Sequence, residues 1–375
     1  GLFRMDPVAK RYICWRCGSA YDSDMKFCGK CGADMHRASR LQKEASDAAI
    51  SASASESGAR ARRLSDADPW IGRVIDNRYR IVEQIGQGGM GVVYKVEHQR
   101  MGKIAALKML HAELARDPEV QERFHREAEA VSRLNHHNTV QVFDFGTADG
   151  MLYLVMEYLR GVNVGELVDR DGPLQYADAA PLCAQTSASL AEAHDRGVIH
   201  RDLTPENILV TRTGRGRDFV KVLDFGLAKL TEREELAEVT GRGTVVGTPY
   251  YMSPEQIRGD DIDARSDIYA LGALMYKVLT GHPPFEAKNP VGVLTKHLTD
   301  DVLPPSVRRP DLGIDERVDE LVCRCLAKDA SDRFQSTSDL AEAIEVLFSE
   351  LDEASHISSR LYIGSRAARV LSTGG

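Results

Sequence analysis

Two short runs in the second half of this 375-residue chain carry side chains that could do chemistry. The first is HRDLTPEN, residues 200–207, and the second is DFG, residues 224–226. Asp202 lies between the strand-like stretches GVIH and NILV, so a plain surface ion pair is not the favoured interpretation. A carboxylate held there can accept a proton from a hydroxyl group. Asn207 and Asp224 offer the oxygen ligands that a hard divalent cation prefers.

A glycine-rich stretch, IGQGGMGVV at residues 85–93, predicts a turn that handles phosphate. Without Cβ atoms, glycines let backbone N–H groups approach phosphate oxygens closely. The pattern alone also fits the first turn of a Rossmann fold. Strand-like residues on both sides of the glycines favour a β-hairpin instead, as does the lysine Lys108, 17 residues after Gly91. The acidic ribose ligand of a Rossmann fold is missing at its usual place.

Lys108 and Glu127 are predicted to form an ion pair. A lone lysine is usually a solvated surface residue, but Lys108 sits in the apolar stretch IAALKML. Glu127 lies beside the apolar stripe of a helix that we expect to begin at Asp117-Pro118. The stripe consists of Val120, Phe124, Ala128, Val131 and Leu134. A carboxylate that faces inward needs a cation, which Lys108 can supply.

In this order, the motifs resemble those of bacterial Ser/Thr protein kinases of the eukaryotic-like (Hanks) type. The resemblance implies an α+β fold of two lobes, with a β-rich small lobe and a helical large lobe. It also implies ATP-dependent transfer of the γ-phosphoryl group to Ser or Thr of protein substrates, including autophosphorylation, in signal transduction. Asp202 would be the catalytic base, Lys108 would pair with the α- and β-phosphates while Glu127 holds it, and Asn207 and Asp224 would bind Mg²⁺ or Mn²⁺.

The resemblance further implies a nucleotide site in which Val93 and Ala106 cover the adenine and Leu209 lies beneath it. Met156 matches the gatekeeper position, and residues 157–159 match the hinge. The implied nucleotide-binding residues are Ile85, Gly86, Gln87, Gly88, Gly89, Met90, Gly91, Val93, Ala106, Lys108, Met156, Glu157, Leu159 and Leu209.

Thr204 departs from the family pattern, in which Ser/Thr kinases usually carry a lysine that contacts the transferred phosphate. Loss of one such charge typically costs on the order of 10²-fold in rate. We therefore group Thr204 with the catalytic residues and keep an alternative, a nucleotide-binding pseudokinase scaffold. Against that alternative, the catalytic lysine, its glutamate, the base and both cation ligands are all present.

Residues 224–255 match an activation segment, and GTPYY at 247–251 resembles the substrate-docking loop of Ser/Thr kinases. Arg201 implies control by a phosphate on this segment, through a charge-assisted pair. Thr240 and Thr244 are the candidate acceptors, although either could be an ordinary loop threonine. The resemblance also implies two structural residues of the large lobe: Asp267, and Arg333 as the partner of Glu255.

Four cysteines near the N-terminus, Cys14, Cys17, Cys28 and Cys31, form the pattern CxxCG-x₉-CxxCG. Two such turns predict a tetrahedral site for structural Zn²⁺ and resemble a zinc ribbon. A redox pair is the weaker alternative, because no thioredoxin-like βαβ pattern surrounds the cysteines. The ribbon is expected to dock a protein partner or to have a purely structural role; a further alternative makes it a recruitment module regulated by the kinase domain.

The expected organisation is a zinc ribbon at 12–35, a flexible Ala/Ser/Arg-rich linker at 36–75, a kinase domain at 76–348 and a tail at 349–375. The formal net charge of -8 argues against a broad nucleic-acid-binding surface. No apolar run is long enough to span a bilayer, and no signal-peptide pattern is present. With the cysteine distribution, these features predict a cytoplasmic protein.

Overall fold

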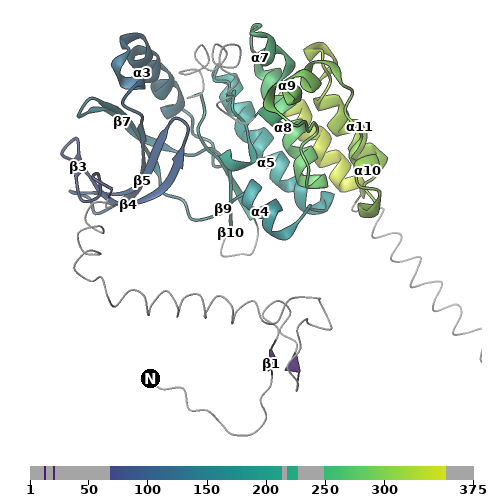
Figure 1. Cartoon of the computed structure of the whole chain (residues 1–375), viewed down its shortest axis with the longest axis horizontal. Helices are drawn as coiled ribbons and strands as arrows, with labels where there is room; N and C mark the ends of the chain where they lie inside the picture. The colour runs from purple at the N-terminus through teal and green to yellow at the C-terminus, as the bar shows by residue number, and fades with distance from the viewer. Residues whose placement is uncertain (1–11, 14–19, 22–67, 213–217, 227–248, 352–375) are drawn as a thin grey trace, which may run out of the picture. The chain divides into compact units, whose positions relative to one another are not determined.

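The computed structural model describes residues 12–13, 20–21, 68–212, 218–226 and 249–351. Contacts divide the chain into two units, Gly1–Pro69 and Trp70–Gly375. In the first unit, strands β1 (Tyr12–Ile13) and β2 (Ala20–Tyr21) pair antiparallel. The second unit has a sheet-rich lobe followed by a helical lobe (Figure 1), which confirms the predicted α+β architecture.

The small lobe is built on a six-stranded antiparallel sheet in the order β3-β4-β5-β6-β8-β7. Its strands are β3 (Val74–Ile75), β4 (Tyr79–Gly88), β5 (Gly91–His98), β6 (Ile104–Leu110), β7 (Val142–Ala148) and β8 (Met151–Glu157). In β6, Leu107 and Met109 pack on one face while Ala106 and Leu110 join the core on the other. A strand covered on both faces is apolar throughout, which explains the sequence around Lys108.

Helix α3 (Pro118–Ser132), preceded by the 3₁₀ helix η1 (Leu114–Arg116), packs against β7 and β8. The carboxylate of Asp117 accepts a hydrogen bond of 2.8 Å from the backbone N–H of Glu119, and Pro118 occupies the first helical position. Both features stabilise a helix start. The predicted apolar stripe is buried from Val120 to Leu134, so this helix is confirmed.

The compact unit includes residues on both sides of 76–348, the range predicted for the kinase domain. Residues 70–75, assigned to the linker, belong to the sheet: Gly72 N–H donates to Ile81 O at 2.9 Å, and Ile81 N–H donates to Arg73 O at 2.8 Å. Trp70 packs against the buried residues of that sheet. At the other end, the last described helix covers residues 337–351 and Leu351 packs on the core, three residues past the predicted boundary.

The large lobe is organised around α8 (Ala264–Thr280), which is almost entirely buried. The helix begins at the capping residue Asp263 and ends at Gly281, whose φ of 80° suits glycine. Asp267, which the resemblance implied as a structural residue, lies in the first turn of this helix. α5 (Tyr176–Asp195), α10 (Pro305–Arg308), α11 (Glu316–Cys325) and the 3₁₀ helix η4 (Pro249–Tyr251) pack against it. The large lobe also contains α4 (Val164–Asp171), α7 (Pro254–Arg258), α9 (Pro290–Thr299) and the 3₁₀ helices η5 (Pro310–Leu312) and η6 (Ala330–Asp332).

Between the sheet and the helices lies a three-stranded sheet in the order β11-β10-β9, with the 3₁₀ helix η2 (Pro205–Asn207) before β10. The strands are β9 (Val162–Asn163), β10 (Ile208–Arg212) and β11 (Asp218–Val222). The HRDLTPEN run, residues 200–207, ends where β10 begins, and the DFG run, residues 224–226, starts just after β11. The hairpin therefore holds the two runs side by side. In the part of the chain that the structure describes, no helix is long and apolar enough to cross a membrane.

Candidate active site

The backbone of the first run is held by Asp267 in the first turn of α8. Its carboxylate accepts hydrogen bonds from the N–H groups of His200 at 2.8 Å and Arg201 at 2.9 Å. Arg201 has a φ of 70°, a left-handed conformation that these bonds help to hold. Burial alone would raise the pKa of Asp267, but the hydrogen bond from His194 and those from the backbone lower it overall. Asp267 is thus a buried anion that sets the shape of the loop.

His200 connects the two runs. Its Nε2 donates to the carbonyl oxygen of Leu223 at 2.8 Å, and its ring lies 4.8 Å from that of Phe225, centroid to centroid. Burial lowers the pKa of the imidazole, so the neutral ring is favoured. The residue before Asp224 and the residue after it are therefore both positioned by the first run.

Asp202 and Asn207 lie together across η2. The Nδ2 group of Asn207 donates to the carbonyl oxygen of Asp202 at 2.7 Å and lies 3.5 Å from its Oδ2. Leu223 N–H donates to Asn207 O at 2.8 Å, which joins this pair to the strand that leads to Asp224. The side chain of Asp202 is exposed to solvent.

Thr204 is buried, with 7% of its surface exposed, and its carbonyl oxygen accepts the N–H of Asn207 at 3.1 Å. It precedes the first residue of η2. The position of the expected lysine is thus part of the turn that holds Asn207.

Lys108 and Asp224 form an ion pair across the lobes. The distance from Lys108 Nζ to Asp224 Oδ2 is 2.8 Å, and the two side chains are 10% and 27% exposed. Asp224 has a φ of 57°, uncommon for a residue with a side chain. Glu127 lies by the same motif: its Oε2 is 3.4 Å from where a Cβ on Gly226 would stand. The direct contact between Lys108 and Glu127 stays a prediction.

The glycine-rich stretch forms the β4–β5 hairpin, with Gly88 opposite Gly91. A Cβ at Gly91 would stand 2.1 Å from the carbonyl oxygen of Met109. Any side chain there would push the hairpin away from β6, the strand that carries Lys108. Packing alone therefore requires glycine at this position.

The strand register brings several predicted nucleotide-binding residues together. Val93 lies opposite Lys108 on β5 and β6, and Ala106 lies opposite Met156 on β6 and β8. Ala106 and Met156 are buried and Ile85 is exposed, while Val93, Leu159 and Leu209 are half-buried. Gln87 and Met90 lie at the tip of the same hairpin as Gly86 and Gly89. Their contacts with a nucleotide stay predictions.

Glu157, the first hinge residue, has a partner that the sequence did not reveal. Its Oε1 accepts hydrogen bonds from Lys221 Nζ at 2.5 Å and from the N–H of Gln141 at 2.9 Å. Lys221 sits in β11, three residues before Asp224, so the hinge is tied to the strand that presents this carboxylate. The only signal was a lysine inside the apolar stretch FVKVL.

Arg333 and Glu255 form the predicted pair. The guanidinium donates two parallel bonds of 2.7 and 2.8 Å to the carboxylate and is fully buried. Burial would raise the pKa of Glu255, but the bonds from Arg333 and Ser266 lower it to about 2. Glu255 lies in the first turn of α7, at the end of the predicted activation segment, and Arg333 follows η6. The pair anchors one end of that segment to the large lobe.

Two sets of predicted residues lie outside the described part of the chain: the cysteines Cys14, Cys17, Cys28 and Cys31, and the candidate phosphoacceptors Thr240 and Thr244. Among the described residues, no cluster of His, Cys, Asp and Glu could hold a metal ion by protein ligands alone.

Comparison with known proteins decides the family. The model of the protein kinase domain matches residues 79–344. The chain belongs to the protein kinase family. A zinc-ribbon domain model matches residues 13–35, in agreement with the predicted ribbon.

Relatives and solved structures agree with this assignment. The chain is 43% identical over 293 residues to the serine/threonine-protein kinase pkn3 of Myxococcus xanthus, covering 78% of this chain and 53% of that protein. It is 40% identical to PknB of Mycobacterium tuberculosis, covering 75% and 44%. The kinase domain of PknI from M. tuberculosis superimposes with a TM-score of 0.60 at 28% identity, covering 74% of this chain and 98% of that one. The chain spans about half the length of the curated relatives it matches.

Proposed function

We propose that the chain is an ATP-dependent protein serine/threonine kinase that phosphorylates protein substrates, including itself, in signal transduction. The observation that carries this proposal is the convergence of Asp202, Asn207, Asp224 and Lys108 from separate elements. The relatives named serine/threonine-protein kinases support the same activity.

Each residue has a role that follows from its contacts. Asp202 accepts the proton of the substrate hydroxyl while the hydroxyl oxygen forms a bond to the γ-phosphorus of ATP. The bond between the γ-phosphorus and the β,γ-bridging oxygen breaks, and ADP leaves with its electron pair. Asn207 holds Asp202 through Nδ2, which leaves Oδ1 as its ligand atom. Asp224 accepts from Lys108 through Oδ2, so Oδ1 is the oxygen it can offer. These hard oxygen donors fit Mg²⁺, which would neutralise charge on the phosphates.

Lys108 is the cation for the α- and β-phosphates. Its amine is buried against the core of the small lobe, so the surrounding medium screens its charge little. The hairpin above it is held close by Gly91. Val93, Ala106, Met156 and Leu209 offer apolar surface for adenine, with backbone groups of Glu157 and Leu159 for its polar edge.

We further propose that Cys14, Cys17, Cys28 and Cys31 hold one structural Zn²⁺ and that the ribbon docks a protein partner. The CxxC spacing, the match to a zinc-ribbon model and the β1–β2 pair that flanks the first two cysteines in sequence support the metal. Use of ATP and of reduced thiolates suits the cytoplasm, which we propose as the location.

The decisive experiment compares the wild-type chain with Asp202→Asn after incubation with labelled ATP and Mg²⁺, with mapping of phosphosites. We expect phosphate on Ser or Thr in the wild type and a loss of about 10²–10⁴-fold in the variant, with ATP binding unchanged. Asp169→Asn, an exposed acid on α4, is the matched control. A wild-type chain that binds ATP–Mg²⁺ and transfers nothing would make the nucleotide-binding scaffold the better conclusion.

A further inference from the structure

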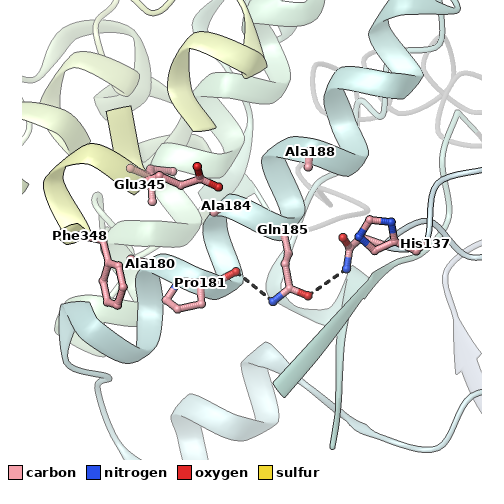
Figure 2. Close-up of a pocket in the computed structure, with 10 residues that line it drawn as sticks. His137, Ala180, Pro181, Ala184, Gln185, Ala188, Glu345 and Phe348 are labelled. Carbon is pink, nitrogen blue, oxygen red and sulfur yellow. Dashed lines mark hydrogen bonds between the residues drawn. The ribbon is translucent and has the colours of Figure 1, made fainter. Parts of the chain in front are cut away.

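A groove of about 400 Å³ lies between α5 and the helix of residues 337–351 (Figure 2). Its α5 side presents Ala180, Ala184 and Ala188, four residues apart and so on one face of the helix. Ile344 and Phe348 form the opposite wall. Three short side chains in a row leave space between two helices that larger residues would fill. The volume falls in the range of cavities that hold ligands, roughly 300–1,000 Å³.

One end of the groove is polar and is bonded to the active-site hairpin. Asn138, which lines this end, donates through Nδ2 to Gln185 Oε1 at 3.0 Å and to Val220 O at 2.8 Å. Gln185 Oε1 also accepts the N–H of Val220 at 3.0 Å. Asn138 O in turn accepts the N–H of Val222, two residues before Asp224, at 2.7 Å. An occupant of the groove would therefore contact the residues that hold β11.

We propose that Leu361-Tyr362-Ile363 of this same chain occupies the groove. The chain continues past Leu351 directly from the helix that supplies Ile344 and Phe348, so the segment is tethered to one wall. The ten residues from 351 to 361 can span about 33 Å when extended. The return from the end of the helix to Ile344 requires only about 10 Å. The segment has ample length to turn back.

The composition and charge of residues 360–363 favour this part of the tail as the occupant of the groove. Residues 361–363 form a run of three apolar or aromatic side chains, and Arg360 precedes them. Figure 2 shows Glu345 on the helix wall of the groove, where it is exposed. Arg360 can pair with it while the three side chains enter the apolar part. Tethering raises the local concentration of the segment to the order of mM, which favours it over a free partner.

The experiment measures amide hydrogen exchange of residues 361–363 in the full chain, with the melting temperature as a second readout. Ala184→Leu fills the groove, and the triple change Leu361→Ser, Tyr362→Ser, Ile363→Ser removes the occupant. Ala177→Leu, at an exposed position of α5 outside the groove, is the matched control. Neither readout needs catalysis, so failure here would leave the kinase assignment intact.

We expect exchange at residues 361–363 to be at least tenfold faster in Ala184→Leu than in the wild type and the Ala177→Leu control. The triple variant should melt about 3–6 °C lower than the wild type. Once the segment is changed, Ala184→Leu should cause no further loss, because both changes remove the same contact. Exchange at free-peptide rates in the wild type would overturn the proposal. So would protection that Ala184→Leu leaves unchanged, or protection that disappears on dilution, which would point to a second copy.

Discussion

Replacement of Arg333 by methionine should destabilise the large lobe strongly. The substitution keeps an apolar side chain of similar length but leaves the Glu255 carboxylate, 12% exposed, without its two bonds from the guanidinium. The depression of the Glu255 pKa from 4.5 to about 2 corresponds to about 3 kcal/mol of stabilisation. Removal of one partner of a buried pair typically costs about 3–5 kcal/mol. We expect Arg333→Met to lose about 3–4 kcal/mol at pH 7.

The free energy of unfolding that Arg333→Met loses should depend on pH. A carboxyl group whose pKa is lowered in the folded state contributes stability that is complete above its unfolded value, here 4.5. That stability is lost as the pH falls from 4.5 through about 2. In Arg333→Met the Glu255 carboxyl becomes easier to protonate, so the difference from the wild type should shrink below pH 4.5.

Urea unfolding followed by circular dichroism at pH 7, 5.5 and 4 measures this difference. The control is Arg317→Met, whose ion pairs with Asp315 and Glu350 are exposed and screened by solvent, so that the free energy of unfolding should stay nearly unchanged. A loss below about 1 kcal/mol for Arg333→Met, or a loss that does not change between pH 7 and 4, would refute the reasoning.

Four further changes test the site and the ribbon. Lys108→Met should lower autophosphorylation at least about 10²-fold because it removes the phosphate cation; normal kinetics would contradict the mechanism. Thr204→Lys should raise kcat, with little effect on KM, because it restores a charge that acts in the transition state; an unchanged kcat would mean that another cation already serves. Thr240→Ala with Thr244→Ala should lower the activity of the phosphorylated chain substantially, measured with a generic peptide; full activity would assign Arg201 another partner. Elemental analysis should find one zinc per chain, lost in Cys31→Ser, while the main thermal transition of the kinase domain stays; zinc-free wild type would disprove the ribbon site.

The sequence predicted the local elements of this fold well where one physical rule dominates. The stripe of α3 follows from apolar periodicity, and Asp117 and Pro118 mark the start of this helix by backbone chemistry that acts over a few residues. The pairing of Arg333 with Glu255, 78 positions apart, came from family resemblance, because no local pattern carries a contact at such separation.

Several contacts between residues far apart in the chain could not be predicted from the sequence. The bond between Lys221 and Glu157 depends on how β11 lies against the hinge, which two isolated charges do not indicate. The ion pair of Lys108 with Asp224 was not predicted, because the burial of a lysine indicates that it needs an anion but does not identify which nearby carboxylates supply it. The packing of residues 70–75 on the sheet could not be read from the sequence, because the two apolar residues of β3 make too brief a pattern to separate from a linker.

The short strand β3 protects the sheet from unwanted association. It pairs with the outer side of β4, whose other side pairs with β5. Gly72 and Arg73, just before β3, continue this cover by bonding the C=O and N–H groups of Ile81. A chain cut to begin at Asp76, the boundary that the motifs alone suggest, would expose this row of backbone groups. Open edges of this kind recruit strands from other molecules. Purified protein that starts at residue 68 should therefore stay monodisperse at concentrations where the shorter chain aggregates, although both contain every residue of the active site.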